Sequence, residues 1–230
     1  MRKSTFDSAP SLIDFEGAVV RINFDVERVE QPVPSNGGEG GETRTVYMAY
    51  VCRVAQPLSV DAVKTALIAE GFREFKAEAV ASEALLSLVQ SGEAAGDELA
   101  LAKQMMTARI GDYDSSKAVD EFFINGESHW IPREYREMFE ERLAQERRRG
   151  HTTVSLDMPD AQPGDAPLTL EVETAGVMLQ RLNDYATDSY DCTQAHKRAV
   201  AALTTVEAVT GYDYTTGYPE KIDFDQMFEP

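Results

Sequence analysis

The chain has 230 residues, 43% of them hydrophobic and 27% charged, a composition typical of one large or two small folded domains and too apolar for general disorder. Its formal net charge of −18 argues against nucleic-acid binding, because a protein that binds phosphates needs a basic face. No apolar run approaches the ~20 residues of a membrane-spanning helix or follows the N-terminus as in a secretion signal, so we expect neither membrane binding nor export.

Two segments in the first part of the chain alternate apolar and polar residues with a period of two, which indicates strands with one buried face. They cover residues 20–27 and 46–54, and a loop rich in proline and glycine, residues 31–42, separates them. This loop lacks the Gly-Lys-Ser/Thr signature and no helix follows it, so it does not fit a phosphate-binding loop. We predict an antiparallel β-ribbon with a loose tip.

Three helical patterns follow the ribbon. Ser59 is placed to cap the first of them, and Gly71 is placed to end it. Apolar residues at helical spacing also cover residues 77–90 and 97–110. These patterns predict a helical region directly after the ribbon.

A polar stretch at residues 111–116 interrupts the helical pattern, and we place a domain boundary at its end. The first predicted domain, residues 1–116, holds the ribbon and the helical region. The second, residues 117–230, holds β-hairpins and long helices. The sequence therefore predicts an α+β fold, with an N-terminal antiparallel β-ribbon followed by helices, then a C-terminal domain of β-hairpins packed with long helices.

The first hairpin of the second domain is predicted at residues 122–131. Its Asn-Gly pair, Asn125 and Gly126, is the strongest short turn signal, because a type I′ turn needs positive φ at both central positions. Pro132 opens a helix that ends before Gly150, and its missing N–H costs nothing in the first turn. Three consecutive arginines at the helix end suit the helix dipole better than they suit a phosphate-binding patch.

A second hairpin is predicted to join residues 152–156 to residues 168–172. Thr174 can cap a long helix behind it, which Asp191 and Thr193 could instead divide into two. The apolar stripe of this helix recurs every three or four positions, at Met178, Leu182, Tyr185, Ser189, Cys192, His196, Ala199, Leu203 and Val206.

Candidate groups for chemistry are few. Cys52 and Cys192 both fall on apolar faces, so we expect buried free thiols. His129, His151 and His196 each lack a second histidine or cysteine at the spacing of metal ligands. Cys192 and His196 share a helix face and could form a thiolate and its base. The apolar stripe that holds them instead favours a buried histidine whose hydrogen bonds are made within the core. The sequence predicts no catalytic residue, no cofactor and no metal.

Several segments of the C-terminal half carry a resemblance to a known family. They are residues 123–126 with Trp130, residues 182–186, residues 192–197 and residues 212–219. Over roughly residues 120–225, the chain resembles an uncharacterised domain family of phage and prophage proteins, found near or fused to tail-fibre and tail-fibre-assembly proteins. Residues 12–15 and 48–51 make the N-terminal half similar to prophage proteins of gut Bacteroidales.

This resemblance implies a non-enzymatic structural or accessory component of a bacteriophage or prophage tail, in the fibre or baseplate region. Such a protein would bind other phage tail proteins, form a homo-oligomer, and move from the host cytoplasm during assembly to the tail of the virion. The alternative is a tail-fibre assembly chaperone that is absent from the mature particle. An enzyme with a pocket around His196 or Cys192, and a DNA mimic with carboxylates spaced like phosphates, are more distant alternatives.

Four aromatic residues are candidate protein-binding residues, Trp130, Tyr212, Tyr214 and Tyr218. Large, stiff and amphipathic side chains of this kind dominate protein interfaces. For Tyr212 and Tyr218 the alternative interpretation is that they pack the C-terminal tail onto its own domain.

Overall fold

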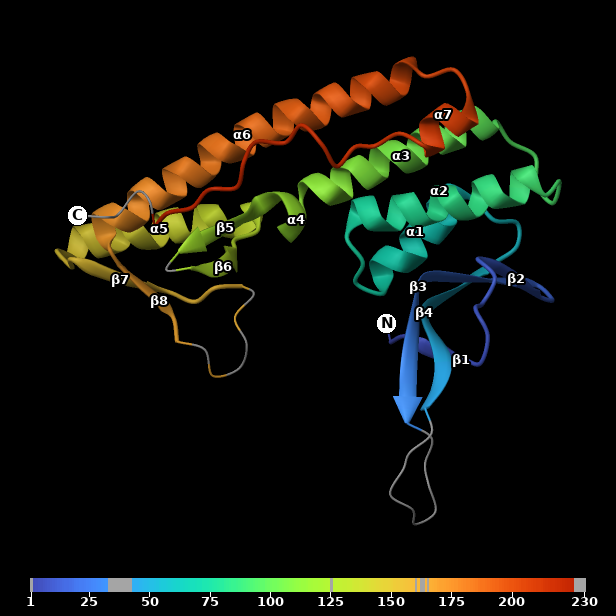
Figure 1. Ribbon diagram of the computed structural model, residues 1–230, viewed down its shortest axis with the longest axis horizontal. Coiled ribbons are helices and arrows are strands. Elements are labelled where there is room, and N and C mark those ends of the chain that lie inside the picture. Colours follow the sequence, from blue (N-terminus) through green and yellow to red (C-terminus); the bar gives the residue numbers. More distant parts are fainter. Residues whose placement is uncertain are drawn as a thin grey trace, which may run out of the picture. The chain divides into compact units, whose positions relative to one another are not determined.

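The computed structural model describes residues 2–32, 43–124, 126–159, 161, 164 and 166–225, and it has an α+β fold, as predicted (Figure 1). These residues form two compact units. The first unit holds the chain up to Arg109 together with Leu203–Gly211, and the second holds Ile110–Ala202 and the chain from Tyr212 onward. The structural division thus differs from the predicted boundary at residue 116, since a helix carries the chain past residue 110 without a break.

The first unit contains a four-stranded antiparallel sheet with the strand order β1-β4-β3-β2. Its strands are β1 (Ser4–Phe6), β2 (Ile13–Glu16), β3 (Val19–Pro32) and β4 (Thr43–Ala55). The predicted ribbon is the β3–β4 pair, which is longer than predicted at both ends. Its predicted tip, residues 31–42, lies outside the described residues apart from the last positions of β3. The two short edge strands were not predicted.

One face of the ribbon is buried against helices because apolar residues alternate along both strands. Ile22 and Cys52 are register partners, and both are buried. The alternation fails at a β-bulge after Phe24, where Asp25 adopts a positive φ of 50°. The bulge turns Val26 toward solvent, with 43% of it exposed, although the period of two predicted it on the buried face.

Four helices belong wholly or partly to the first unit: α1 (Val60–Ala69), α2 (Glu74–Gln90), α3 (Glu98–Asp114) and α7 (Val206–Thr210). Ser59 caps α1 as predicted, since its hydroxyl accepts a hydrogen bond from the amide of Ala62 at 3.2 Å. α3 runs on into the stretch that we predicted as a polar break. Gly111 and Asp114 are helical and buried there, and Asp114 tolerates burial because Arg133 neutralises its charge.

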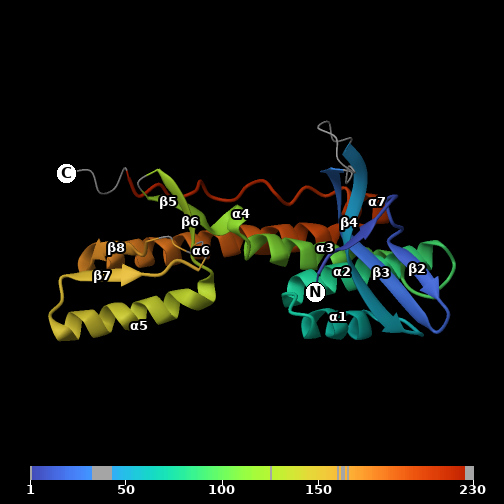
Figure 2. The same ribbon diagram turned by 90° about the horizontal axis from the view of Figure 1, so that it is seen from below.

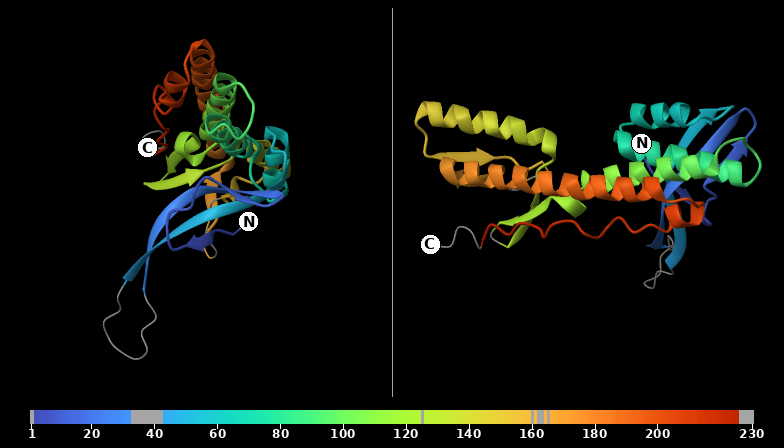
Figure 3. Two further views of the ribbon diagram at one scale, coloured as in Figure 1. Left: turned by 90° about the vertical axis from the view of Figure 1, so that its right-hand side faces the viewer. Right: turned by 90° about the horizontal axis from the view of Figure 1, so that it is seen from above.

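The second unit contains two hairpins and two long helices. Its elements are α4 (Lys117–Asp120), β5 (Glu121–Ile124), β6 (Glu127–Trp130), α5 (Arg133–Arg149), β7 (Thr153–Leu156), β8 (Leu168–Glu171) and α6 (Val172–Ala202). Both predicted hairpins are confirmed, and β7 contacts both long helices (Figure 3). Gly126 has the positive φ that the predicted turn needs, whereas Asn125 is outside the described residues. Pro132 is the N-cap of α5, one residue before the predicted position, and Gly150 ends the helix with φ 75°.

α6 is a single continuous helix that begins at Val172, so neither Asp191 nor Thr193 breaks it. The predicted stripe is correct as far as Ser189. Beyond that residue, Thr193 and Val200 are buried, whereas the prediction placed Cys192 and Ala199 on the buried stripe. Leu203 and Val206 lie beyond the end of the helix.

The core of the second unit combines both hairpins, both long helices and the C-terminal stretch. Its buried residues are Phe122, Ile124, Ile131, Phe139, Leu143, Val154, Leu156, Met158, Val172, Ala175, Met178, Leu179, Leu182 and Phe224. Within the described part of the chain, no helix combines the length and the apolar character needed to cross a membrane.

Candidate functional site

The C-terminal segment, residues 212–225, lies extended along α6 and reaches β5 (Figure 2). His196 on α6 holds its first part, with Nδ1 2.8 Å from the Tyr212 hydroxyl and Nε2 2.9 Å from the Thr216 carbonyl oxygen. Because a carbonyl can only accept, Nε2 donates to Thr216. The His196 ring also stacks on Tyr218 at a centroid distance of 5.7 Å.

Tyr113 near the end of α3 joins two of the segment's tyrosines. Its ring meets Tyr214 at 5.6 Å and Tyr218 at 5.5 Å between centroids, both edge to face. The Tyr218 hydroxyl lies 2.9 Å from Oγ1 of Thr193, and burial raises the pKa of Tyr218 to about 12. The three predicted tyrosines are therefore half-buried and engaged within their own unit.

Trp130, the fourth predicted binding residue, is not part of this aromatic group. It ends β6 opposite Glu121, and its side chain is half-buried. The indole N–H is enclosed and has no hydrogen-bond acceptor among the described residues. Trp130 therefore lies on the β5–β6 hairpin, apart from the tyrosine group.

The last part of the C-terminal segment joins the edge of β5 through a single parallel bridge between Asp223 and Phe123. Phe123 donates its N–H to the Ile222 carbonyl at 2.9 Å and accepts from the Phe224 N–H at 2.9 Å. Phe224 is fully buried against Phe122, with ring centroids 5.7 Å apart. Asp225 closes the contact, because its carboxylate accepts from the Gly126 N–H at 2.6 Å. Sequence reasoning did not identify this contact.

Four charged residues form a cluster inside the second unit. Arg133 binds Asp114 through both terminal nitrogens, at 2.9 and 3.1 Å, and its Nε lies 3.2 Å from Asp120. Arg136 lies 3.4 Å from the other Asp120 oxygen and donates to the Leu182 carbonyl at 2.7 Å. Asp120 is 1% exposed and Arg136 is 3% exposed. The cluster is electrically neutral, as burial requires.

Desolvation sets the pKa shifts of the two most buried members of this cluster. Burial raises the pKa of Asp120, although the two guanidiniums oppose the shift. Burial lowers the pKa of Arg136, against the attraction of Asp120. One sequence signal pointed to this cluster. Arg133 and Arg136 lie in the first turn of α5, where the helix dipole disfavours cations, so carboxylates had to lie nearby.

The two cysteines have different environments, and only one of the two predictions of burial is correct. Cys52 is buried in the first unit, whereas Cys192 is partly exposed on α6. Burial raises the pKa of the Cys192 thiol, whose sulfur lies 3.9 Å from the Thr216 carbonyl oxygen. His196 is likewise half-buried rather than part of the core. Since Tyr212 and Thr216 take both imidazole nitrogens, neither is left to act as a base for Cys192.

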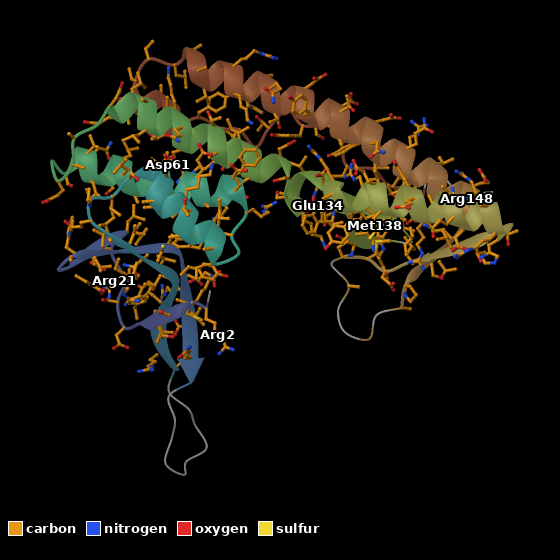
Figure 4. All side chains as sticks on the ribbon, turned by 180° about the vertical axis from the view of Figure 1, so that it is seen from behind. Arg2, Arg21, Asp61, Glu134, Met138 and Arg148 are labelled. Atoms are coloured by element: carbon orange, nitrogen blue, oxygen red, sulfur yellow. The ribbon has the colours of Figure 1, made fainter. Side chains whose placement is uncertain are left out.

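The outer face of α5 exposes two large apolar side chains one turn apart. Tyr135 is 42% exposed and Met138 is 51% exposed, although Phe139 beside them is buried in the core. Figure 4 labels Glu134 and Met138 on this helix. We call Tyr135 and Met138 the α5 pair. The sequence analysis treated the helix only as strongly charged and did not single them out.

Among the described residues, no group of three or more histidine, cysteine or acidic side chains is arranged to hold a metal ion. No protein-family model, curated protein or solved structure matches this chain.

Proposed function

We propose that this chain is a non-enzymatic structural or accessory component of a bacteriophage or prophage tail, in the fibre or baseplate region, that works by binding another tail protein. The observation that carries the binding role is the exposed α5 pair. The tail assignment is supported by the resemblance of residues 120–225 to tail-associated domains.

The α5 pair has the make-up of a small interface centre. Tyr135 and Met138 are neighbours on one helix face, and the helix is held from its opposite side by Phe139 and Leu143. Charged side chains at positions 134, 141 and 142 surround the pair. An apolar centre with a charged rim is typical of interfaces, and tyrosine and methionine are enriched there. The rigid helix fixes both anchors before a partner arrives.

The contacts of Asp120 and Arg136 support a structural role for these two buried charged residues. Asp120 forms an ion pair with Arg136 at 3.4 Å, and Arg136 donates to the backbone carbonyls of Ile131 and Leu182, so the two residues connect α4, α5 and α6. Groups committed in this way shape the binding surface rather than react with a substrate.

The test is quantitative mass spectrometry of purified particles and of the cell lysate. The expected result is a constant ratio of this chain to known tail proteins in the particle. A Tyr135→Ser/Met138→Ser variant should be incorporated roughly tenfold less, since losing about 1.4 kcal/mol of binding free energy lowers an equilibrium constant tenfold. Arg148→Gln, at an exposed position at the far end of the same helix, serves as the matched control and should be incorporated normally.

The two tail roles give different outcomes in this measurement. A chain that is abundant in the lysate but missing from particles would replace the component role with that of an assembly chaperone. Equal incorporation of the Tyr135→Ser/Met138→Ser variant and the wild type would contradict the α5 pair as the binding surface. Thermal melts of both variants confirm that they are folded, as expected for exposed positions.

A further inference from the structure

A short sequence occurs twice in the chain, each time at the edge of a sheet. Ile13-Asp14-Phe15-Glu16 forms β2, the edge strand beside β3. Ile222-Asp223-Phe224-Asp225 meets β5 through one parallel bridge between Asp223 and Phe123. In β2 the isoleucine and the phenylalanine project to one face and the two acids to the other, because side chains alternate along a strand. The C-terminal copy bends after Asp223, whose carboxylate accepts from the N–H of Asp225 at 3.0 Å.

The β5 edge recognises each part of the C-terminal copy. Ile222 packs against the core of the second unit, and Phe224 is fully buried within it. The backbone of Phe123 bonds the carbonyl before the central aspartate and the amide after it. Gly126 donates its N–H to the terminal acid, Asp225. The contact therefore suits a segment with the pattern Ile-Asp-Phe-acid that pairs with Phe123 through the backbone groups on either side of its aspartate.

The N-terminal copy offers Phe15 and its backbone edge for such a contact, whereas Ile13 packs against its own core and Asp14 and Glu16 pair with arginines of the same sheet. Phe15 is 54% exposed, the largest exposure among the exposed large hydrophobic residues. Leu12 accepts a backbone hydrogen bond from Asn23 of β3 at 2.8 Å, and in an antiparallel pair alternate residues direct their backbone groups to the partner. The carbonyl of Ile13 and the amide of Phe15 therefore face the free edge of β2. These are the equivalents of the two groups through which the C-terminal copy binds Phe123.

We propose that the β5 edge is an acceptor site for an Ile-Asp-Phe-acid strand, filled within one chain by residues 222–225 and between copies by β2 of a second copy. The contact joins two different surfaces of the same chain. Repetition of such a contact builds a head-to-tail ring or an open chain of copies. This inference concerns contacts between copies and does not depend on a role in a phage tail.

Competition between the two strands regulates the contact. The C-terminal segment is tethered, so its effective concentration at the site is on the order of millimolar. It also forms an ion pair between Lys221 and Glu121 that β2 lacks, because Leu12 occupies the position of Lys221. β2 of a second copy therefore binds well only where the C-terminal segment is loosened. The apparent affinity of the site for β2 is the intrinsic affinity multiplied by the fraction of sites that the C-terminal segment leaves open.

The first test measures binding of a fluorescent peptide of residues 11–17 by anisotropy. The wild-type chain is compared with a Lys221→Gln/Asp225→Asn variant, which loosens the C-terminal segment without altering Phe122, Phe123 or Gly126. We expect the variant to bind the peptide about tenfold more tightly than the wild type. A peptide with Phe15→Ala should bind about tenfold more weakly, since it cannot fill the Phe224 pocket.

The second test is light scattering of the full chain over a range of concentrations. The loosened variant should self-associate more than the wild type, and adding Phe15→Ala should reverse this gain. Val26→Ala, at another exposed position of the same sheet, is the matched control and should leave the association unchanged.

Three outcomes would overturn the proposal. Equal binding of the native and Phe15→Ala peptides would show that Phe15 is not recognised. Absence of peptide binding to the loosened variant would show that the β5 edge is no acceptor for this strand. Self-association of the loosened variant that is unchanged by Phe15→Ala would point to exchange of C-terminal segments between copies. Incorporation into particles is a separate readout, so each proposal can fail alone.

Discussion

Asp120 shows how one buried residue joins separate elements of the second unit. It ends α4 and meets two arginines of α5, one of which also donates to the carbonyl of Leu182 on α6. Its burial is tolerated only because these cations and the second acid, Asp114, leave the cluster neutral. The two arginines in the first turn of α5 indicate that a carboxylate lies nearby, but the sequence does not single out Asp120 as that carboxylate, because Arg133 lies 13 positions away from it.

We expect Asp120→Asn to destabilise the protein by about 3 kcal/mol, because breaking a buried ion pair leaves the Arg136 charge without its compensating carboxylate. Urea denaturation followed by circular dichroism measures the change. Asp188→Asn on the exposed side of α6 is the matched control, and its effect should stay within about 0.5 kcal/mol. A loss below about 1 kcal/mol for Asp120→Asn would show that the backbone carbonyls suffice for Arg136.

At the scale of elements, the sequence predicts what a local period encodes and misses what tertiary contacts decide. The ribbon, both hairpins and the long helices follow from alternation, turn residues and caps. The strands β1 and β2 are too short, at three and four residues, to show a period. α3 continues through a polar stretch because Arg133 pairs with Asp114, a contact between different elements. The aromatic C-terminal segment was predicted as a group, but its use of His196 and Tyr113 depends on the fold.

Two glycines near the same end of the α5–α6 pair separate the effect of backbone conformation from the effect of crowding. Gly150→Ala should cost about 1 kcal/mol, because φ there is 75° and a side chain is strained in the left-handed region. Gly176→Ala within α6 should change stability by less than about 0.5 kcal/mol. Its new Cβ would meet only the flexible end of Arg147, at 2.7 Å, and alanine gains helix propensity. Equal losses in parallel urea titrations would contradict this distinction.

At the scale of the whole molecule, the charge of −18 opposes both the compact state and the approach of a second copy. The ion pairs that are exposed on both sides, such as Arg28–Glu30 and Arg147–Glu173, offset little of this, since exposed pairs contribute about 0–1 kcal/mol each. The proposed contact between copies is mainly apolar, through Phe15, and carries acids of its own. Salt that screens like charges should therefore favour folding and association together.

Raising NaCl from about 0.01 M to about 0.1 M shortens the Debye length from about 30 Å to about 10 Å. We expect the melting temperature of the chain to rise by roughly 2–4 °C, as a gain of about 1 kcal/mol would produce for a chain of this size. Scanning calorimetry measures the shift, and sucrose of equal osmolality controls for effects other than screening. In light scattering, the loosened variant should self-associate more strongly over the same salt range. A melting temperature that falls with salt would mean that the ion pairs stabilise the fold more than the repulsion between like charges destabilises it. Weaker self-association at higher salt would mean that charge pairing between copies, rather than Phe15, drives the contact.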